Sequence, residues 1–117
     1  MPVKHTSDIP TQPVKAGDHT SIQLLMQGPN FAMRRFVIEP YGRMPRHTNT
    51  VEHVQYVLGG QARIAIGEDE FTVQTGDAVL IPEGIPHWYQ NVGEENFEFL
   101  CMIPNKEDIV KIIGKEC

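Results

Sequence analysis

Short runs of apolar residues, broken by Gly, Pro, Asn and Asp, repeat along the chain from Ser21 to Pro104. Runs of this length that are rich in Val, Ile, Phe and Tyr are typical of an all-β protein. The pattern predicts nine short strands, and this number indicates a sandwich or a barrel. The predicted strands are Ile22–Met26, Phe31–Glu39, Arg43–His47, His53–Leu58, Ala62–Ile66, Glu70–Val73, Ala78–Ile81, His87–Asn91 and Phe97–Ile103.

The first twenty residues follow no such pattern. Residues 1–20 mix Pro, Gly, Thr and Asp without periodicity, which predicts an N-terminal arm that lies over the domain or over a neighbour. We assign residues 21–117 to a single domain.

The end of the chain has a different period. In residues 105–115, Asn105 can cap a helix, and isoleucines recur at i, i+3 and i+4 from Ile109. This spacing predicts one short C-terminal helix.

Composition and charge limit the kinds of partner. A chain of 117 residues, 40% hydrophobic and 21% charged, can bury one core and should fold as a single globular domain. Its net charge of −5 offers no basic surface, so we expect neither nucleic acid nor an anionic membrane as a partner. No apolar run is long enough to span a bilayer, and the N-terminus lacks the apolar segment of a secretion signal. We expect a cytoplasmic protein in which Cys101 and Cys117 are free thiols.

Three of the five histidines lie where strands could bring them together. His47 ends one predicted strand, His53 begins the next, and His87 follows a loop with two prolines. Asn49 shares a face with His47 if the extended backbone continues. Neutral imidazoles bind first-row transition metals, and an amide oxygen can add a weaker contact. From the residues alone, the four form either an open metal site or a set of polar side chains bonded to backbone at strand ends.

The surrounding segments carry a family resemblance. Residues 76–91 match the pattern G-x5-P-x-G-x2-H-x3-N, which is the second motif of the cupin family, position by position. Residues 42–60 resemble the first cupin motif, G-x5-H-x-H-x3-E-x6-G, with three differences. The first gap is one residue shorter, Asn49 stands in place of the second histidine, and His53 stands in place of the glutamate. More narrowly, residues 29–34, 52–53, 56–58 and 99–104 resemble small manganese-binding single-domain cupins, in which four histidines hold the metal.

The resemblance implies a cupin jelly-roll β-barrel, with the predicted terminal helix appended and often with a homodimer formed through edge strands or arms. Carried over by position, it gives His47, His53 and His87 as metal ligands and puts Asn49 in the place of the fourth. The cofactor would be a divalent transition-metal ion, namely manganese, iron, nickel, copper or zinc. Asn49 either contributes to the metal site or marks a site that has lost its metal.

All four candidate ligands are neutral, so a bound ion would keep its charge and favour an anionic substrate. We therefore predict a metal-binding cupin, and as its function an enzyme that acts on a small organic acid or sugar-derived molecule. Dioxygenase, decarboxylase and isomerase chemistry all fit. The alternative is a non-catalytic cupin that binds a small molecule and has a weakened or lost metal site. A third possibility is a metal with a purely structural role.

Further pocket candidates follow from strand alternation. Because Arg34 and Arg35 are adjacent, one of them points into the barrel, where it is either an anchor for a substrate carboxylate or part of a structural ion pair. Gln55 and Tyr89 lie two residues from His53 and His87 and share their faces. Trp88 and Met102 are predicted on an outer face suited to a dimer interface.

Overall fold

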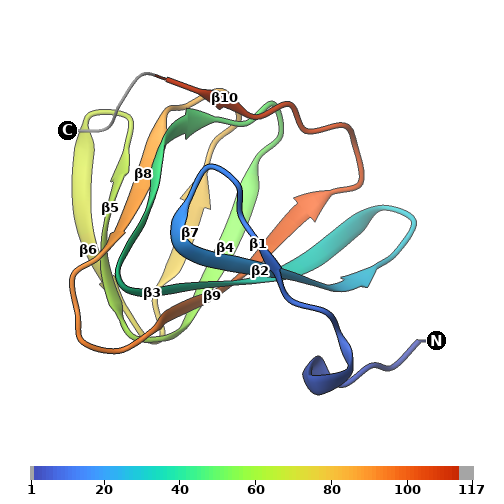
Figure 1. Cartoon of the computed structure of the whole chain (residues 1–117). Coiled ribbons are helices and arrows are strands. Elements are labelled where there is room, and N and C mark those ends of the chain that lie inside the picture. Colours follow the sequence, from blue (N-terminus) through green and yellow to red (C-terminus); the bar gives the residue numbers. More distant parts are fainter. Residues whose placement is uncertain (1, 114–117) are drawn as a thin grey trace.

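The computed structural model describes residues 2–113 and is built almost entirely of strands (Figure 1). Within that range no helix is long and apolar enough to cross a membrane. The elements, in chain order, are a 3-10 helix η1 (Thr6–Asp8) and the strands β1 (Gln12–Pro13), β2 (Asp18–Gln27), β3 (Phe31–Thr48), β4 (His53–Gly59), β5 (Gln61–Ile66), β6 (Asp69–Gln74), β7 (Ala78–Ile81), β8 (His87–Asn91), β9 (Phe97–Pro104) and β10 (Lys111–Ile112).

The strands form a curled antiparallel sheet with the order β6-β5-β8-β3-β9-β4-β7, and β2 and β10 also pair with β3 (Figure 1). This arrangement confirms the predicted all-β cupin jelly roll. The sheet turns over on itself because β3 belongs to both halves. Residues 31–38 of β3 pair with β9, and residues 43–47 pair with β8.

The bend in β3 joins two strands that the sequence pattern predicted separately. Tyr41 has a φ of 69°, and a Cβ at Gly42 would lie 2.7 Å from the carbonyl oxygen of Asp18 and 2.8 Å from that of Glu39. Glycine at position 42 therefore permits the close approach that folds β3. The other predicted strands are present, with ends shifted by a few residues at most.

The core lies between the two halves of the curled sheet. Aromatic rings form its centre: Phe99 stacks on Phe36 at a centroid distance of 5.0 Å and on Tyr89 at 5.3 Å. Phe97 and Ile38 are completely buried beside them. This packing supports one end of the barrel, while the histidines occupy the other end of the same interior.

The predicted C-terminal helix is wrong over the described part of segment 105–115. Residues 105–110 are irregular, and Lys111 and Ile112 pair with Thr48 and His47 of β3. An isolated helix of about three turns is marginal in water, whereas pairing with β3 satisfies backbone groups and covers the pocket. Residues 114 and 115 lie outside the described residues, as does Cys117.

The predicted N-terminal arm contains both loose and paired segments. Thr6 and Ile9 accept hydrogen bonds from the Gln23 amide through their carbonyl oxygens, at 3.0 Å each. Further on, β1 pairs with β2, and Val14 packs against the core. The predicted boundary at residue 20 falls inside β2.

Candidate metal and ligand pocket

One cavity of about 220 Å³ opens at the end of the barrel interior where the histidines lie. All four predicted ligands line it, as do three of the four further pocket candidates. The lining consists of Val14, Ala16, Gly17, Ile22, Arg34, Phe36, Met44, Pro45, His47, Asn49, His53, Gln55, His87, Tyr89, Phe99, Val110 and Ile112. The fourth further candidate, Arg35, does not line it.

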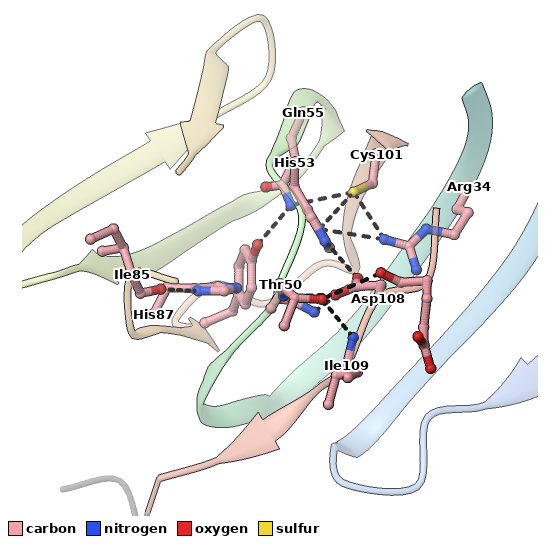
Figure 2. Close-up of polar contacts among 12 residues, drawn as sticks. Arg34, Thr50, His53, Gln55, Ile85, His87, Cys101, Asp108 and Ile109 are labelled. Atoms are coloured by element: carbon pink, nitrogen blue, oxygen red, sulfur yellow. Dashed lines mark hydrogen bonds and ion pairs between the residues drawn. The ribbon is translucent and has the colours of Figure 1, made fainter. Parts of the chain in front are cut away.

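His47 and His87 face each other across two paired strands. The β3–β8 register puts them directly opposite, and their ring centroids are 4.2 Å apart. His47 Nδ1 donates to the carbonyl oxygen of Pro45 at 2.7 Å. His87 Nδ1 donates to that of Ile85 at 2.9 Å (Figure 2). Because a carbonyl can only accept, the neutral rings carry their proton on Nδ1. Their Nε2 atoms therefore keep a free lone pair, which is the arrangement found in metal-bound histidines.

The proline-containing loop before β8 aims His87 at the pocket. Gly84 has a φ of 76°, and its N–H donates to the carbonyl oxygen of Asn49 at 2.8 Å. This bond ties the loop to the segment that carries Asn49. The turn needs the conformation that glycine adopts most readily, as the second cupin motif predicts.

His53 holds its proton on the opposite nitrogen. The Arg34 guanidinium donates to His53 Nδ1 at 3.4 Å, so that atom accepts and the proton of the neutral ring is on Nε2 (Figure 2). His53 Nε2 then donates to the Asp108 carboxylate at 3.1 Å. The ring of His53 lies 6.4 Å from that of His87, so it is near the other two but already has a partner.

Asn49 contributes an unpaired oxygen. Its side chain is buried, its amide nitrogen donates to Asp108 at 3.1 Å, and its Oδ1 has no hydrogen-bond partner in the described chain. A buried acceptor without a partner costs free energy unless something binds to it. A cation at this oxygen would remove that cost.

The residues fit a metal ion by their chemistry, although they are not gathered around one point. Between residues 2 and 113, no three His, Cys, Asp or Glu side chains are grouped so as to hold an ion as they stand. Two free imidazole nitrogens and one unpaired amide oxygen nevertheless line the same cavity. This donor set suits a first-row transition metal.

Burial keeps the three imidazoles neutral. It lowers the pKa of His47, His53 and His87, and the pKa of His87 falls to about 4. The nearby His47 lowers the pKa of His87 further. The Asp108 carboxylate raises the pKa of all three rings and so opposes the effect of burial. Neutral imidazole is the form that binds metal, so these rings need not lose a proton at neutral pH.

The lowered pKa of His87 predicts that the metal-free protein loses stability in mild acid. The unfolded chain, with a histidine pKa of 6.5, binds more protons than the folded chain between pH 6.5 and about pH 4. The free energy of unfolding should therefore fall as the pH falls through this range, by up to about 3 kcal/mol from His87. Urea unfolding at pH 7 and pH 4.5 measures the difference. His87→Gln should show a smaller one, and an equal pH dependence in both proteins would contradict the assignment.

Arg34 and Arg35 point in opposite directions. Arg35 forms an ion pair with Glu98 at 2.5 Å and donates to Gln23 Oε1 at 2.7 Å. Arg34 lines the cavity, and its guanidinium carbon lies 5.1 Å from the centre of the Phe36 ring. Among residues 2–113, its buried Nε has no hydrogen-bond partner and no carboxylate forms an ion pair with it. Arg35 is therefore structural, and Arg34 is a cation with no anionic partner in the described part of the chain.

Gln55 and Tyr89 line the pocket, and Cys101 is buried next to Gln55. The Gln55 amide donates to the Tyr89 hydroxyl at 2.7 Å, and burial raises the pKa of that hydroxyl. Tyr89 therefore keeps its proton and can donate it to a ligand. Cys101 is buried between Arg34 and His53, and burial raises its thiol pKa as well.

The sequence pattern missed Asp108, which contacts the pocket residues Asn49 and His53, and it missed the lining residues Val14, Ala16 and Gly17. Asp108 falls in the segment predicted as a C-terminal helix, and the other three fall in the segment predicted as an arm. Both segments come from the chain ends, far in sequence from the motifs that they meet. A glycine beside two apolar residues, and an aspartate close to isoleucines, gave no signal that could place them here.

Comparison with known proteins shows which family and which structures this chain resembles. The family model described as a cupin domain matches residues 34–103. The polyketide cyclase RemF from Streptomyces resistomycificus superposes with a TM-score of 0.88 at 25% identity, over 97% of this chain and 85% of that one.

Two curated proteins also match in sequence. Acireductone dioxygenase 1 of Pectobacterium atrosepticum is 29% identical over 61% of this chain, and the uncharacterized protein MJ1618 of Methanocaldococcus jannaschii is 33% identical over 44% of it. The aligned part spans 42% of each of these two relatives.

Proposed function

This chain belongs to the cupin family, and from that premise we propose that its pocket binds one divalent transition-metal ion and acts on a small organic acid or sugar-derived molecule. The observation that carries the proposal is the pair His47 and His87, which lie opposite each other with both Nε2 atoms free. The ion would be manganese, iron, nickel, copper or zinc, held by these two imidazoles, Asn49 and His53.

When bound, the metal would supply a Lewis acid and a template for the substrate. The chain's own residues would bind and orient that substrate. Arg34 would hold a carboxylate, because it is a pocket-lining cation without an ion-pair partner in the described chain. Tyr89 would donate a hydrogen bond, because Gln55 leaves its proton free.

The names of the similar proteins support enzymatic chemistry. One is a dioxygenase and another is a polyketide cyclase. Dioxygenase, decarboxylase and isomerase reactions on a metal-bound organic acid all remain within the proposal.

A second candidate function rests on the contact between His53 and Asp108. Because this carboxylate already engages one imidazole, the pocket could serve as a non-catalytic binding site for a small molecule without metal. The metal content of the purified protein separates the two functions. We expect about one transition-metal ion per chain, whereas folded protein that binds none of the five metals would exclude the metal-dependent function and leave the second.

Arg34 should determine the affinity for carboxylates. In manganese-loaded protein, Arg34→Gln is expected to weaken the binding of malonate by about 10-fold or more, because a hydrogen bond to a charged group is lost. Isothermal titration calorimetry measures the affinity. Arg35→Gln is the matched control, since Arg35 lies outside the pocket and pairs with Glu98. Equal malonate affinity in the Arg34 variant and the parent would exclude the anchor role.

We also propose a homodimer through the outer face of β4, β7 and β9. Val54 of β4 pairs with Leu80 of β7 on one side and with Met102 of β9 on the other, and Tyr56 pairs with Leu100. Val54, Tyr56 and Leu80 are about half exposed. A row of exposed apolar side chains across three strands is typical of an interface. Trp88, predicted on the same interface, lies instead on β8.

The dimer should dissociate when a charge enters this face. Tyr56→Glu is expected to shift the protein from dimer to monomer in size-exclusion chromatography with light scattering. Phe71→Glu is the control, because Phe71 is as exposed as Tyr56 but lies on β6, which pairs with β5 and is not one of the three strands of the proposed interface. A monomeric parent protein would rule out the dimer.

A further inference from the structure

We propose that Asp108, supplied by the segment between β9 and β10, is the carboxylate ligand of the metal ion in this pocket. The inference rests on the proposed function, which assigned the metal to His47, Asn49, His53 and His87 alone. It adds an anionic ligand from a part of the chain that lies outside both cupin motifs.

The Asp108 carboxylate contacts the motif residues through both of its oxygens (Figure 2). Oδ2 accepts from His53 Nε2 at 3.1 Å and from the Asn49 amide at 3.1 Å. Oδ1 accepts from the backbone N–H of Thr50 at 3.0 Å. The side chain is 14% exposed, so it is largely removed from water.

The segment around Asp108 is fixed to the barrel on both sides of the carboxylate. Ile109 N donates to Thr50 Oγ1 at 2.9 Å, and that hydroxyl donates to the carbonyl oxygen of Glu107 at 3.4 Å. Further on, β10 pairs with the end of β3 at Thr48 and His47. These contacts fix the position of the carboxylate next to Asn49 and His53.

Within the described chain, the hydrogen-bond donors to the carboxylate are an imidazole, a side-chain amide and a backbone N–H, and none of them is the side chain of a Lys or Arg. A divalent ion would bring positive charge to this largely buried carboxylate.

The contact between His53 and Asp108 puts two potential ligand atoms next to each other, with His53 Nε2 and Asp108 Oδ2 3.1 Å apart. A metal on Nε2 would require the ring proton to be on Nδ1, where the Cys101 sulfur at 3.3 Å can accept it. Arg34 would then donate to that sulfur, 3.3 Å away, and no longer to Nδ1. His47 and His87 would complete the ligand set.

The experiment compares cation binding by three metal-free proteins: the parent, Asp108→Asn and Glu107→Gln. Glu107 is the matched control because it is the adjacent acid and is exposed. Manganese is titrated by calorimetry, and cobalt binding is followed by its visible absorption. We expect the Asp108 variant to bind manganese at least about 10-fold more weakly and to give a changed cobalt spectrum. The Glu107 variant should match the parent in both.

Several results would overturn the inference. Equal manganese affinity and an unchanged cobalt spectrum in Asp108→Asn would show that the carboxylate is not a ligand. Tighter binding in that variant would show that Asp108 competes with the metal for His53. In either case the proposed function survives. A folded parent that binds no metal would overturn the proposed function and this inference together.

A second measurement applies if the Asp108 variant fails to fold. A crystal structure of the parent protein grown with manganese should place an Asp108 oxygen within about 2.2 Å of the ion. A longer separation, with the ion on the histidines alone, overturns the inference without any variant.

Discussion

His87→Ala is expected to weaken metal binding by more than about 100-fold while leaving the barrel folded. His87 presents a free Nε2 to the pocket and is oriented by the carbonyl oxygen of Ile85. It is also 1% exposed, so its ring is enclosed by the barrel. Calorimetric titration of metal-free protein with manganese and zinc measures the loss, and circular dichroism reports the fold.

The control for this experiment is His5→Ala. His5 is exposed, lies in the N-terminal segment and bonds to Ser7. Its removal should leave metal affinity unchanged, so a loss in both variants would point to nonspecific binding by surface histidines. If the His87 variant binds metal as tightly as the parent, the assignment of His47 and His87 as a ligand pair is wrong.

Phe99→Ala should have the largest effect on stability, a loss of about 3–5 kcal/mol in the free energy of unfolding. The Phe99 ring is 1% exposed and stacks between Phe36 and Tyr89, so truncation leaves a cavity that rigid strands cannot close. In a domain of this size such a loss lowers the melting temperature by roughly 10 °C or more.

Thermal unfolding by calorimetry and urea unfolding at pH 7 measure the loss for Phe99→Ala. Phe71→Ala is the matched control, since it removes the same atoms from a ring that is 48% exposed. It should cost less than about 1 kcal/mol. Similar losses in the two variants would mean that the stacked rings are not the centre of the core.

The strands and the motif turns were readable in the sequence because their signals are local. Alternation of apolar residues and the positions of Gly and Pro predicted every strand from β2 to β9, and the two strands predicted over residues 31–47 form one bent β3. The motif glycines Gly60, Gly76 and Gly84 all have positive φ, as expected of tight turns. The convergence of the motif histidines on one cavity also agrees with their positions in the motifs.

Other features of the site depend on contacts between distant segments. Alternation required one of Arg34 and Arg35 to face inward, but the choice follows from Glu98, which pairs with Arg35 from β9. The tautomers of His47 and His87 follow from the carbonyl oxygens two residues before each ring, and that of His53 from Arg34.

By itself, the sequence determined the all-β barrel, the bends that shape it and the four motif side chains that line one cavity. The tertiary structure alone decided that residues 105–110 are irregular and that Lys111 and Ile112 pair with β3. It also decided that Asp108 contacts Asn49 and His53. The physical reason is that helical periodicity is a weak local preference. The open edge of β3 and the polar groups of Thr50 and His53, more than fifty residues away, offer this segment stronger partners.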